Sequence, residues 1–85
     1  MVNYKVAWAL GEIGGRAAVQ SLIEALGDKS SDVRVIAIHS LQKLGAKEAL
    51  PRLFALLGDN ERNHFGEQVT VAEAAKAAIA KLQAP

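Results

Sequence analysis

Apolar residues recur at helical spacing along the chain, in a pattern that is written twice. Shifting the first half forward by 31 positions brings Leu10 onto Leu41, Leu26 onto Leu57 and the turn glycine Gly14 onto Gly45. Matches at a fixed spacing in both core and turn residues are typical of stacked repeats, in which each unit buries its apolar face against its neighbours. The spacing predicts helices over about 2–13, 17–26, 33–44 and 47–57.

Turn and cap residues set the expected helix ends. Gly14 and the glycine after it end the first helix, and Gly27 stands where a left-handed cap is favoured. Ser30 and the two residues after it offer oxygen acceptors to the amides of the third helix. Pro51 has no amide hydrogen, so the fourth helix begins no earlier than about Lys47 or is distorted there.

The repeat changes register after Asp59. Matching Val33 to Val71 requires a shift of 38 positions, which leaves seven additional residues within 60–70. This segment is polar apart from Phe65 and Val69, so we expect a loop. A last helix follows from about 69 or 70 to 83, and its charged outer residues suit a C-terminal cap: Glu73, Lys76 and Lys81.

The expected organisation is a single domain over 1–85. Repeat 1 covers about 2–27, repeat 2 about 31–58, the loop insertion about 60–68 and a half repeat about 69–83. The predicted inward stripes of the first and third helices are Val2, Val6, Ala9, Leu10 and Ile13, and Val33, Ala37, Ser40, Leu41 and Leu44.

Three stretches resemble the short HEAT-like repeats of the phycobilisome (PBS) lyase type: ALGEIG at 9–14, DVRVIAIHSLQKLG at 32–45 and KEALPRLFALLGD at 47–59. Val33-Arg34, Leu44-Gly45 and Ala49-Leu50-Pro51 match the motif of that family, whereas Asn3 and Gln42 depart from it. The resemblance implies an all-α, right-handed α-α superhelix, a solenoid of five helices in two and a half repeats. It also implies first helices on the outer face, second helices on the inner face, and protein binding as the commonest role. In this family Arg34 would bridge neighbouring repeats, which is a structural role.

Composition narrows the function classes. Hydrophobic residues make up 51% of the 85 residues and aromatic residues only 5%, which suits closely packed helices. The formal net charge of +1 offers no general attraction for nucleic acid or an anionic membrane. Cysteine is absent, and no apolar run approaches the roughly 20 residues that span a bilayer. We therefore expect a cytoplasmic protein without a membrane partner.

Candidate chemistry is sparse. His39 and His64 are the only histidines, and neither has a second ligand at metal spacing. His39 is expected on the outer side of the third helix, exposed to solvent. With no nucleophile beside a base and no paired carboxylates in sight, the sequence predicts no enzyme, no metal and no cofactor.

Three features are candidates for binding. Tyr4 and Trp8 lie four apart and about 200° from the first inward stripe, so they point away from the core and suit contact with another chain. The corresponding positions of the third helix, Val35 and His39, are expected to face outward too. Burial of the aromatic pair under the chain ends, or under a lost upstream repeat, is the competing interpretation.

The second candidate is the inner face, where Ile23 and Phe54 occupy matching positions rimmed by Glu24 and Arg52. Packing of both apolar side chains between the helices is the alternative. The third is the loop, where His64 and Phe65 are candidate contacts, Phe65 either docking a partner or folding back on the last helix. A plain structural insertion is the competing interpretation.

The function predicted from the sequence is a protein-protein interaction module or scaffold. The partner is another protein, and self-association through the terminal helices is a further option. One alternative is an accessory, lyase-like subunit of an enzyme that modifies proteins with bilins or other groups. Nucleic-acid binding is the least favoured, because Arg52 stands almost alone on the inner face and Glu24 opposes it.

Overall fold

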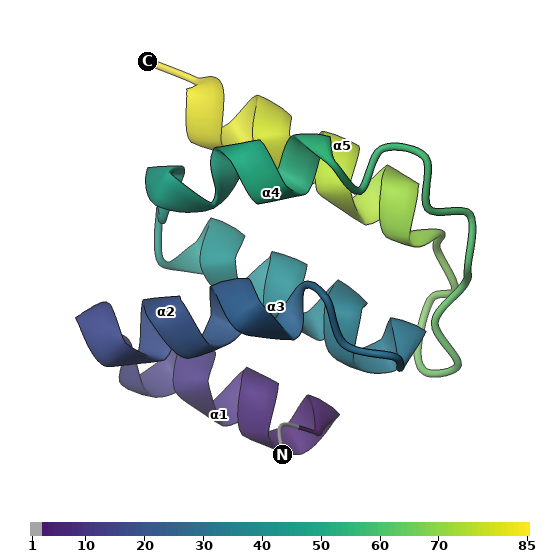
Figure 1. Cartoon of the computed structure of the whole chain (residues 1–85), viewed down its shortest axis with the longest axis horizontal. Coiled ribbons are helices and arrows are strands. Elements are labelled where there is room, and N and C mark those ends of the chain that lie inside the picture. Colours follow the sequence, from purple (N-terminus) through teal and green to yellow (C-terminus); the bar gives the residue numbers. More distant parts are fainter. Residues whose placement is uncertain (1–2) are drawn as a thin grey trace.

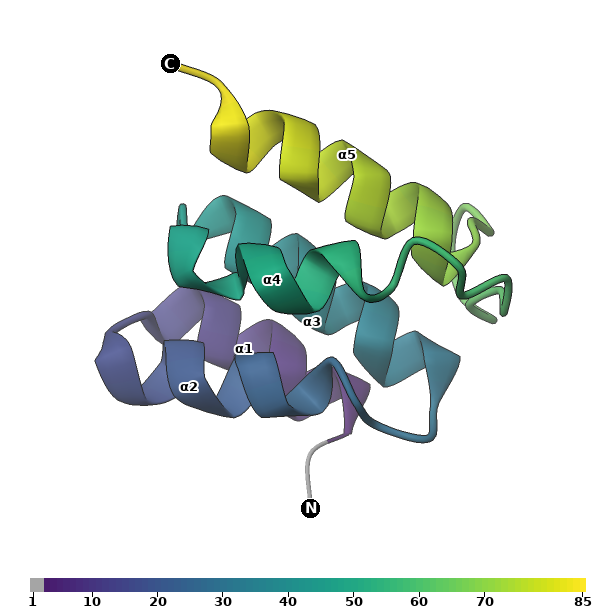
Figure 2. The ribbon, with the colours of Figure 1, turned by 45° about the horizontal axis from the view of Figure 1, so that its top comes forward.

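The structure is a computed structural model that describes residues 3–85, and within them it is all-helical without a strand. Helices α1, α3 and α5 lie side by side in one layer, and α2 and α4 lie in a second layer (Figures 1 and 2). This is the short helical solenoid that the repeat predicts. Its elements are α1 (Tyr4–Ile13), α2 (Arg16–Ala25), α3 (Ser31–Lys43), the 3₁₀ turn η1 (Lys47–Ala49), α4 (Leu50–Phe54) and α5 (Val71–Gln83).

Side-chain caps begin three of the helices. The Asn3 side chain accepts a hydrogen bond from the Val6 amide at 2.9 Å, and Ser30 Oγ accepts one from the Val33 amide at 3.4 Å. Thr70 and Glu73 form a reciprocal capping box at the start of α5. The predicted start of the first helix at Val2 lies outside the described residues.

The expected helix over 47–57 is wrong in length, because the structure divides it. A 3₁₀ turn covers Lys47–Ala49, α4 covers only Leu50–Phe54, and a turn follows from 55 to 58. Pro51 falls within the first two positions of α4, where its missing amide hydrogen leaves no carbonyl unpaired. The proline therefore fixes where the regular helix can begin, as the sequence indicated.

Gly27 is not a left-handed cap, which corrects a second expectation. Positive φ angles occur instead at Gly14 (74°) and Gly45 (65°), which occupy matching positions of the repeat, and at Gly15 and Gly66. The end of α2 tightens into a turn in which the Gly27 amide donates to the Glu24 carbonyl at 3.1 Å. This bond satisfies a terminal carbonyl without a left-handed residue.

The buried face of α1 also differs from the prediction. Val6 and Ile13 are 41% and 78% exposed, whereas Ala7 and Gly11 are buried against α3. A Cβ atom on Gly11 would stand 2.5 Å from Ser40 Oγ, and that hydroxyl donates to the Ala7 carbonyl at 3.1 Å. Small residues on α1 therefore let the two helices pack closely, and Val6 and Ile13 lie outside the buried contact with α3.

Helix α3 is the centre of the core, since α1 and α5 flank it on opposite sides (Figure 1). Ile38 and Leu41 are fully buried, and so is Val35, which was expected to face outward. The same repeat position on α1 is Tyr4, which is 43% exposed. Glu73, Lys76 and Lys81 are exposed on α5, in agreement with a charged outer face.

Arg34 connects α3 to the segment after α4. Its Nη1 donates to the carbonyls of Asp28 (2.7 Å) and Lys29 (3.0 Å), and its Nη2 donates to Glu61 Oε1 at 2.5 Å. Its Nε lies 3.0 Å from Asp59 Oδ2, as an ion pair that is not aligned as a hydrogen bond. The guanidinium is buried and links the two repeats, as the resemblance implied.

Candidate functional site

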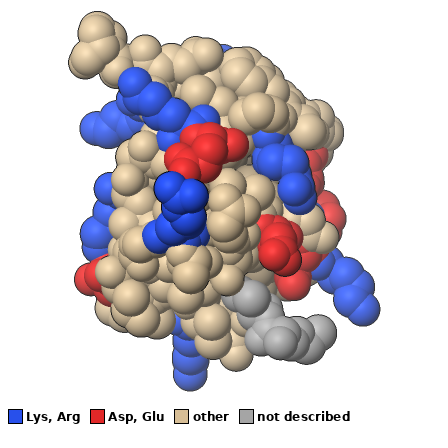
Figure 3. All heavy atoms as spheres, turned by 60° about the vertical axis from the view of Figure 1, so that its left-hand side comes forward, with Lys and Arg blue, Asp and Glu red and all other residues tan. Residues whose placement is uncertain are grey.

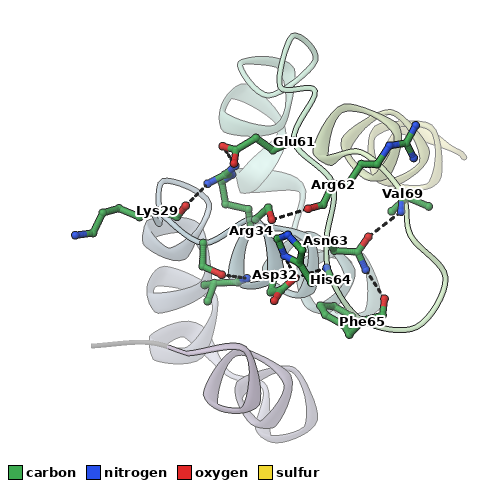
Figure 4. Close-up of polar contacts among 12 residues, drawn as sticks. Lys29, Asp32, Arg34, Glu61, Arg62, Asn63, His64, Phe65 and Val69 are labelled. Atoms are coloured by element: carbon green, nitrogen blue, oxygen red, sulfur yellow. Dashed lines mark hydrogen bonds and ion pairs between the residues drawn. The ribbon is translucent and has the colours of Figure 1, made fainter.

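The loop after Asp59 is folded onto itself by the side chain of Asn63, which is 2% exposed. Asn63 Nδ2 donates to the carbonyls of Phe65 (2.7 Å) and Glu67 (3.3 Å), and Asn63 Oδ1 accepts from the Val69 amide at 2.7 Å (Figure 4). An antiparallel bridge between Arg62 and Thr70 closes the base of the loop. Both N–H groups and the oxygen of the Asn63 side-chain amide are thus hydrogen-bonded within the loop. These bonds give the loop a defined shape.

Two side chains at the start of α3 hold the loop against that helix. Ser31 Oγ donates to the Arg62 carbonyl at 2.7 Å, and Asp32 Oδ1 accepts from the His64 amide at 2.6 Å. The His64 imidazole lies at the surface, with Nδ1 3.3 Å from the same carboxylate oxygen. His64, a candidate contact from the sequence, therefore serves at least to attach the loop to α3.

Phe65 at the tip of the loop stacks on Tyr4 of α1, with ring centroids 5.7 Å apart and planes inclined by 17°. The sequence offered the last helix or a partner as the place for Phe65, but its ring lies against the first helix. Two candidate features that are far apart in the sequence, the outward pair on α1 and the loop, thus form one site.

This site is an apolar pocket of about 500 Å³. Trp8 is 59% exposed and Tyr4 is 43% exposed, so neither is buried under another part of residues 3–85. The lining residues are Tyr4, Lys5, Trp8, Ala9, Ile36 and Phe65. A second hollow of about 220 Å³ continues from it and is lined by Trp8, Glu12, Ile36, His39, Ser40 and Lys43. Because Trp8 and Ile36 border both hollows, we treat the two hollows together as the α1–α3 groove.

The two ends of the α1–α3 groove differ in charge. At the second hollow, Lys43 and Glu12 form an ion pair, and partial burial lowers the pKa of the neighbouring His39 below its ordinary value. His39 is exposed at its edge, as predicted, and the lowered pKa favours its neutral form near pH 7. At the larger hollow, Lys5 is the only charged side chain of the lining, and no carboxylate of residues 3–85 lies within ion-pair distance of it.

The inner face offers a weaker site. Ile23 is partly buried and packs against the core, whereas Phe54 is 48% exposed and the nearby Leu57 is 43% exposed. Glu24 and Arg52 are exposed as expected. The predicted apolar centre of two matching side chains is therefore reduced to the exposed ring of Phe54.

Sequence reasoning missed Ile36 and Lys5 as lining residues of the groove. These two residues are 31 positions apart and so occupy the same place in the repeat. Within residues 3–85 no group of three or more potential ligands is arranged to hold a metal ion, and no helix is long and apolar enough to cross a membrane.

Charged side chains of both signs are dispersed over the face in Figure 3, with Asp and Glu side chains among those of Lys and Arg. A nucleic-acid-binding surface needs a continuous basic patch or stripe. The visible face carries no such feature.

Comparison with known proteins gives two matches. The family model for HEAT repeats matches residues 1–82. Phycocyanobilin lyase subunit alpha of Picosynechococcus sp. is 51% identical over 51 residues, which are 60% of this chain and 19% of that protein. The matched part thus covers about a fifth of the length of this curated relative. No solved structure matches the chain.

Proposed function

Because the chain belongs to the HEAT repeat family, we propose that it is a protein-interaction module without catalysis of its own, and that its partner binds at the α1–α3 groove. The observation that carries this proposal is the aromatic cluster of Tyr4, Trp8 and Phe65 around an open apolar pocket. Large exposed aromatic side chains gathered in a pocket are typical of protein-binding hot spots.

The lining of the groove supports binding rather than a reaction. Catalysis requires a nucleophile beside a base, or an acid and a base that face one reacting atom. The larger hollow is lined almost wholly by apolar atoms, and Lys5 and Tyr4 are its lining residues with a polar end. In the second hollow the Glu12 carboxylate is paired with Lys43, and the Ser40 hydroxyl beside His39 donates to the Ala7 carbonyl. The groove has the chemistry of a contact surface.

The pocket is also pre-formed. Phe65 is positioned by the hydrogen bonds of Asn63 and by its stack on Tyr4, so one wall of the groove is in place before a partner arrives. A surface that is already ordered loses little conformational entropy on binding. This supports the interpretation of the seven-residue insertion as part of the binding site.

The test is affinity capture from the native source, followed by calorimetry with the purified, identified partner. We expect Trp8→Ala to weaken the measured affinity by about tenfold or more, as is usual for a central aromatic contact. Phe54→Ala is the matched control on the inner face and should leave the affinity unchanged. Loss of binding with Phe54→Ala and not with Trp8→Ala would place the contact on the inner face and refute the groove.

A second candidate function is that of an accessory subunit of a bilin lyase or a similar protein-modifying enzyme. The similarity to part of phycocyanobilin lyase subunit alpha supports it. Titration with a tetrapyrrole, followed by absorbance, tests it directly. A spectral change that Trp8→Ala abolishes would favour this function, and an unchanged spectrum together with no co-purifying enzyme subunit would argue against it.

A further inference from the structure

The α1–α3 groove carries one uncompensated positive charge. The ammonium of Lys43 is paired with Glu12, whereas Lys5 at the larger hollow meets no carboxylate within residues 3–85. His39, which also lines the groove, has a pKa lowered by burial and therefore adds little charge near pH 7. A ligand that fills the apolar pocket thus meets a single cation at its edge.

We propose that the groove selects a segment of another protein that places a bulky apolar side chain in the larger hollow and an acidic side chain on Lys5. This inference rests on the proposed function and names the chemistry of the partner. A carboxylate beside the anchor complements the only charge of the lining. A basic residue at the same place would face Lys5 and be repelled.

The dimensions of the groove suit a short helical segment. Tyr4, Trp8 and Glu12 follow one another at steps of four residues along α1. At a rise of 1.5 Å per residue the groove is about 12 Å long, which is about two turns of a partner helix. An amphipathic helix places side chains four residues apart on one face, so the apolar anchor and the acidic residue would lie one turn apart.

The groove is a poorer match for a small molecule. Sites for small ligands combine apolar walls with several polar groups that converge on the ligand and fix its orientation. Here the larger hollow is lined almost wholly by apolar atoms, and it shares Trp8 and Ile36 with the second hollow. A side chain that is tethered to a partner needs no such set of polar groups, because the rest of the partner helix fixes its orientation.

Trp8 is the only tryptophan of the chain and borders both hollows, so its fluorescence reports occupancy of the groove. Three tryptophan-free helical peptides of equal length serve as probes. One carries a Leu-Leu anchor with Glu one turn away, the second has Lys in place of Glu, and the third has Ala in place of both Leu residues. We expect the Glu peptide to shift Trp8 emission to shorter wavelength and to bind about fivefold more tightly than the Lys peptide at low salt.

The Ala peptide should leave the emission unchanged. Lys5→Glu should invert the preference between the Glu and Lys peptides, and Lys5→Ala should abolish it. Phe54→Ala should bind both peptides as the unaltered protein does. Melting curves of each variant, followed by circular dichroism, confirm that the helices are retained.

Equal affinity for the Glu and Lys peptides, or a preference that survives in Lys5→Ala, would overturn the charge selection while leaving the interaction module intact. No response to any peptide would overturn the inference as well, and capture of the native partner then decides the proposed function by itself. A shift of Trp8 emission that depends on protein concentration alone would show that a second copy occupies the groove, which also overturns the inference.

Discussion

At the scale of single residues, buried polar groups tie together segments that are distant in the sequence. Arg34 binds two carbonyls before α3 and two carboxylates after α4, and Asn63 binds three backbone groups of its own loop. Ser40 joins α3 to the Ala7 carbonyl of α1. Each of these groups would be costly to bury alone, so each stabilises the fold only in the presence of its partners.

Arg34→Ala should lower the free energy of unfolding by about 3 kcal/mol, because it leaves the largely buried Asp59 carboxylate without its ion-pair partner and two carbonyls without their donor. Peptide binding at the groove should change less, since Arg34 does not line it. Thermal and urea denaturation measure the loss. Arg34→Lys keeps the charge but loses the planar guanidinium, so its free energy of unfolding should lie between those of Arg34→Ala and the unaltered protein. An unchanged melting temperature for Arg34→Ala would contradict the bridging role.

Gly11→Ala should destabilise the protein although alanine favours helices. The added Cβ would stand 2.5 Å from Ser40 Oγ and 2.7 Å from Ser40 Cβ, so α1 must move away from α3. Overpacking of this kind raises the energy by about 1 to 3 kcal/mol, and the better helix propensity of alanine returns about 1 kcal/mol.

Gly58→Ala is the matched control for Gly11→Ala. No atom lies within 4 Å of a Cβ at that position and its φ is not positive, so we expect no loss of stability there. Urea denaturation of the two variants makes the comparison. Equal stability of Gly11→Ala and Gly58→Ala would show that the close approach of α1 and α3 is not required.

At the scale of elements, α5 illustrates how a local signal sets a helix boundary. The Thr70 amide donates to Glu73 Oε1 at 2.9 Å, and the Glu73 amide donates to Thr70 Oγ1 at 3.0 Å. Hydrogen bonding of the Glu73 carboxylate by the Thr70 amide first, and then by the Thr70 side chain, lowers the pKa of Glu73 below its ordinary value of 4.5. A depressed carboxyl pKa means that the folded state favours the ionised form.

The stability supplied by Glu73 should therefore be present above pH 4.5 and lost as the pH falls through the lower pKa of the folded state. Glu73→Gln removes this titration, so its difference in melting temperature from the unaltered protein should be largest near pH 7 and shrink toward pH 3. Thermal melts across that range give the difference directly. A constant difference at all pH values would show that the charge of Glu73 does not contribute.

The loop provides the next test at this scale. Asn63→Ala removes three hydrogen bonds inside the loop and should release Phe65 from its stack on Tyr4. We expect a loss of about 1 to 3 kcal/mol, faster amide exchange over 63–69, and weaker peptide binding at the groove. Hydrogen exchange followed by mass spectrometry checks the local effect. Gln68→Ala, on an exposed side chain of the same loop, is the control and should change none of the three properties.

Most of the helical architecture could be predicted from the sequence, because the repeat brings Leu10 onto Leu41 and Gly14 onto Gly45. The buried face of α1 was not predicted. Hydrophobicity alone favours burial of Val6 over Gly11, whereas the close contact of α1 with α3 requires the smaller residue on the buried face. A glycine within a helical pattern is the available signal for such a close approach. The stack of Phe65 on Tyr4 could not be inferred, because it depends on a loop shape that the Asn63 side chain sets through backbone contacts.

At the scale of the whole molecule, resistance to local unfolding should be greatest in the central helix α3 and lower in the outer helix α1. Helix α3 lies between α1 and α5 and holds fully buried residues such as Val35 and Leu41, whereas α1 leaves Val6 and Ile13 exposed. Elements that bury less apolar surface open at lower free energy than the core. Each helix of the layer therefore depends on its neighbours, and α3 has neighbours on both sides.

Native-state hydrogen exchange should show this gradient. Amides of α3 are expected to exchange only through global unfolding, and those of α1 at least about tenfold faster through local opening. Repeating the measurement at two protein concentrations separates the isolated chain from a self-associated one, because a second copy on the Val6 side would slow exchange in α1 as the concentration rises. Uniform protection of α1 and α3 at low concentration would mean that the five helices open as one unit, and the stack would then lack the nearest-neighbour energetics that a repeat architecture implies.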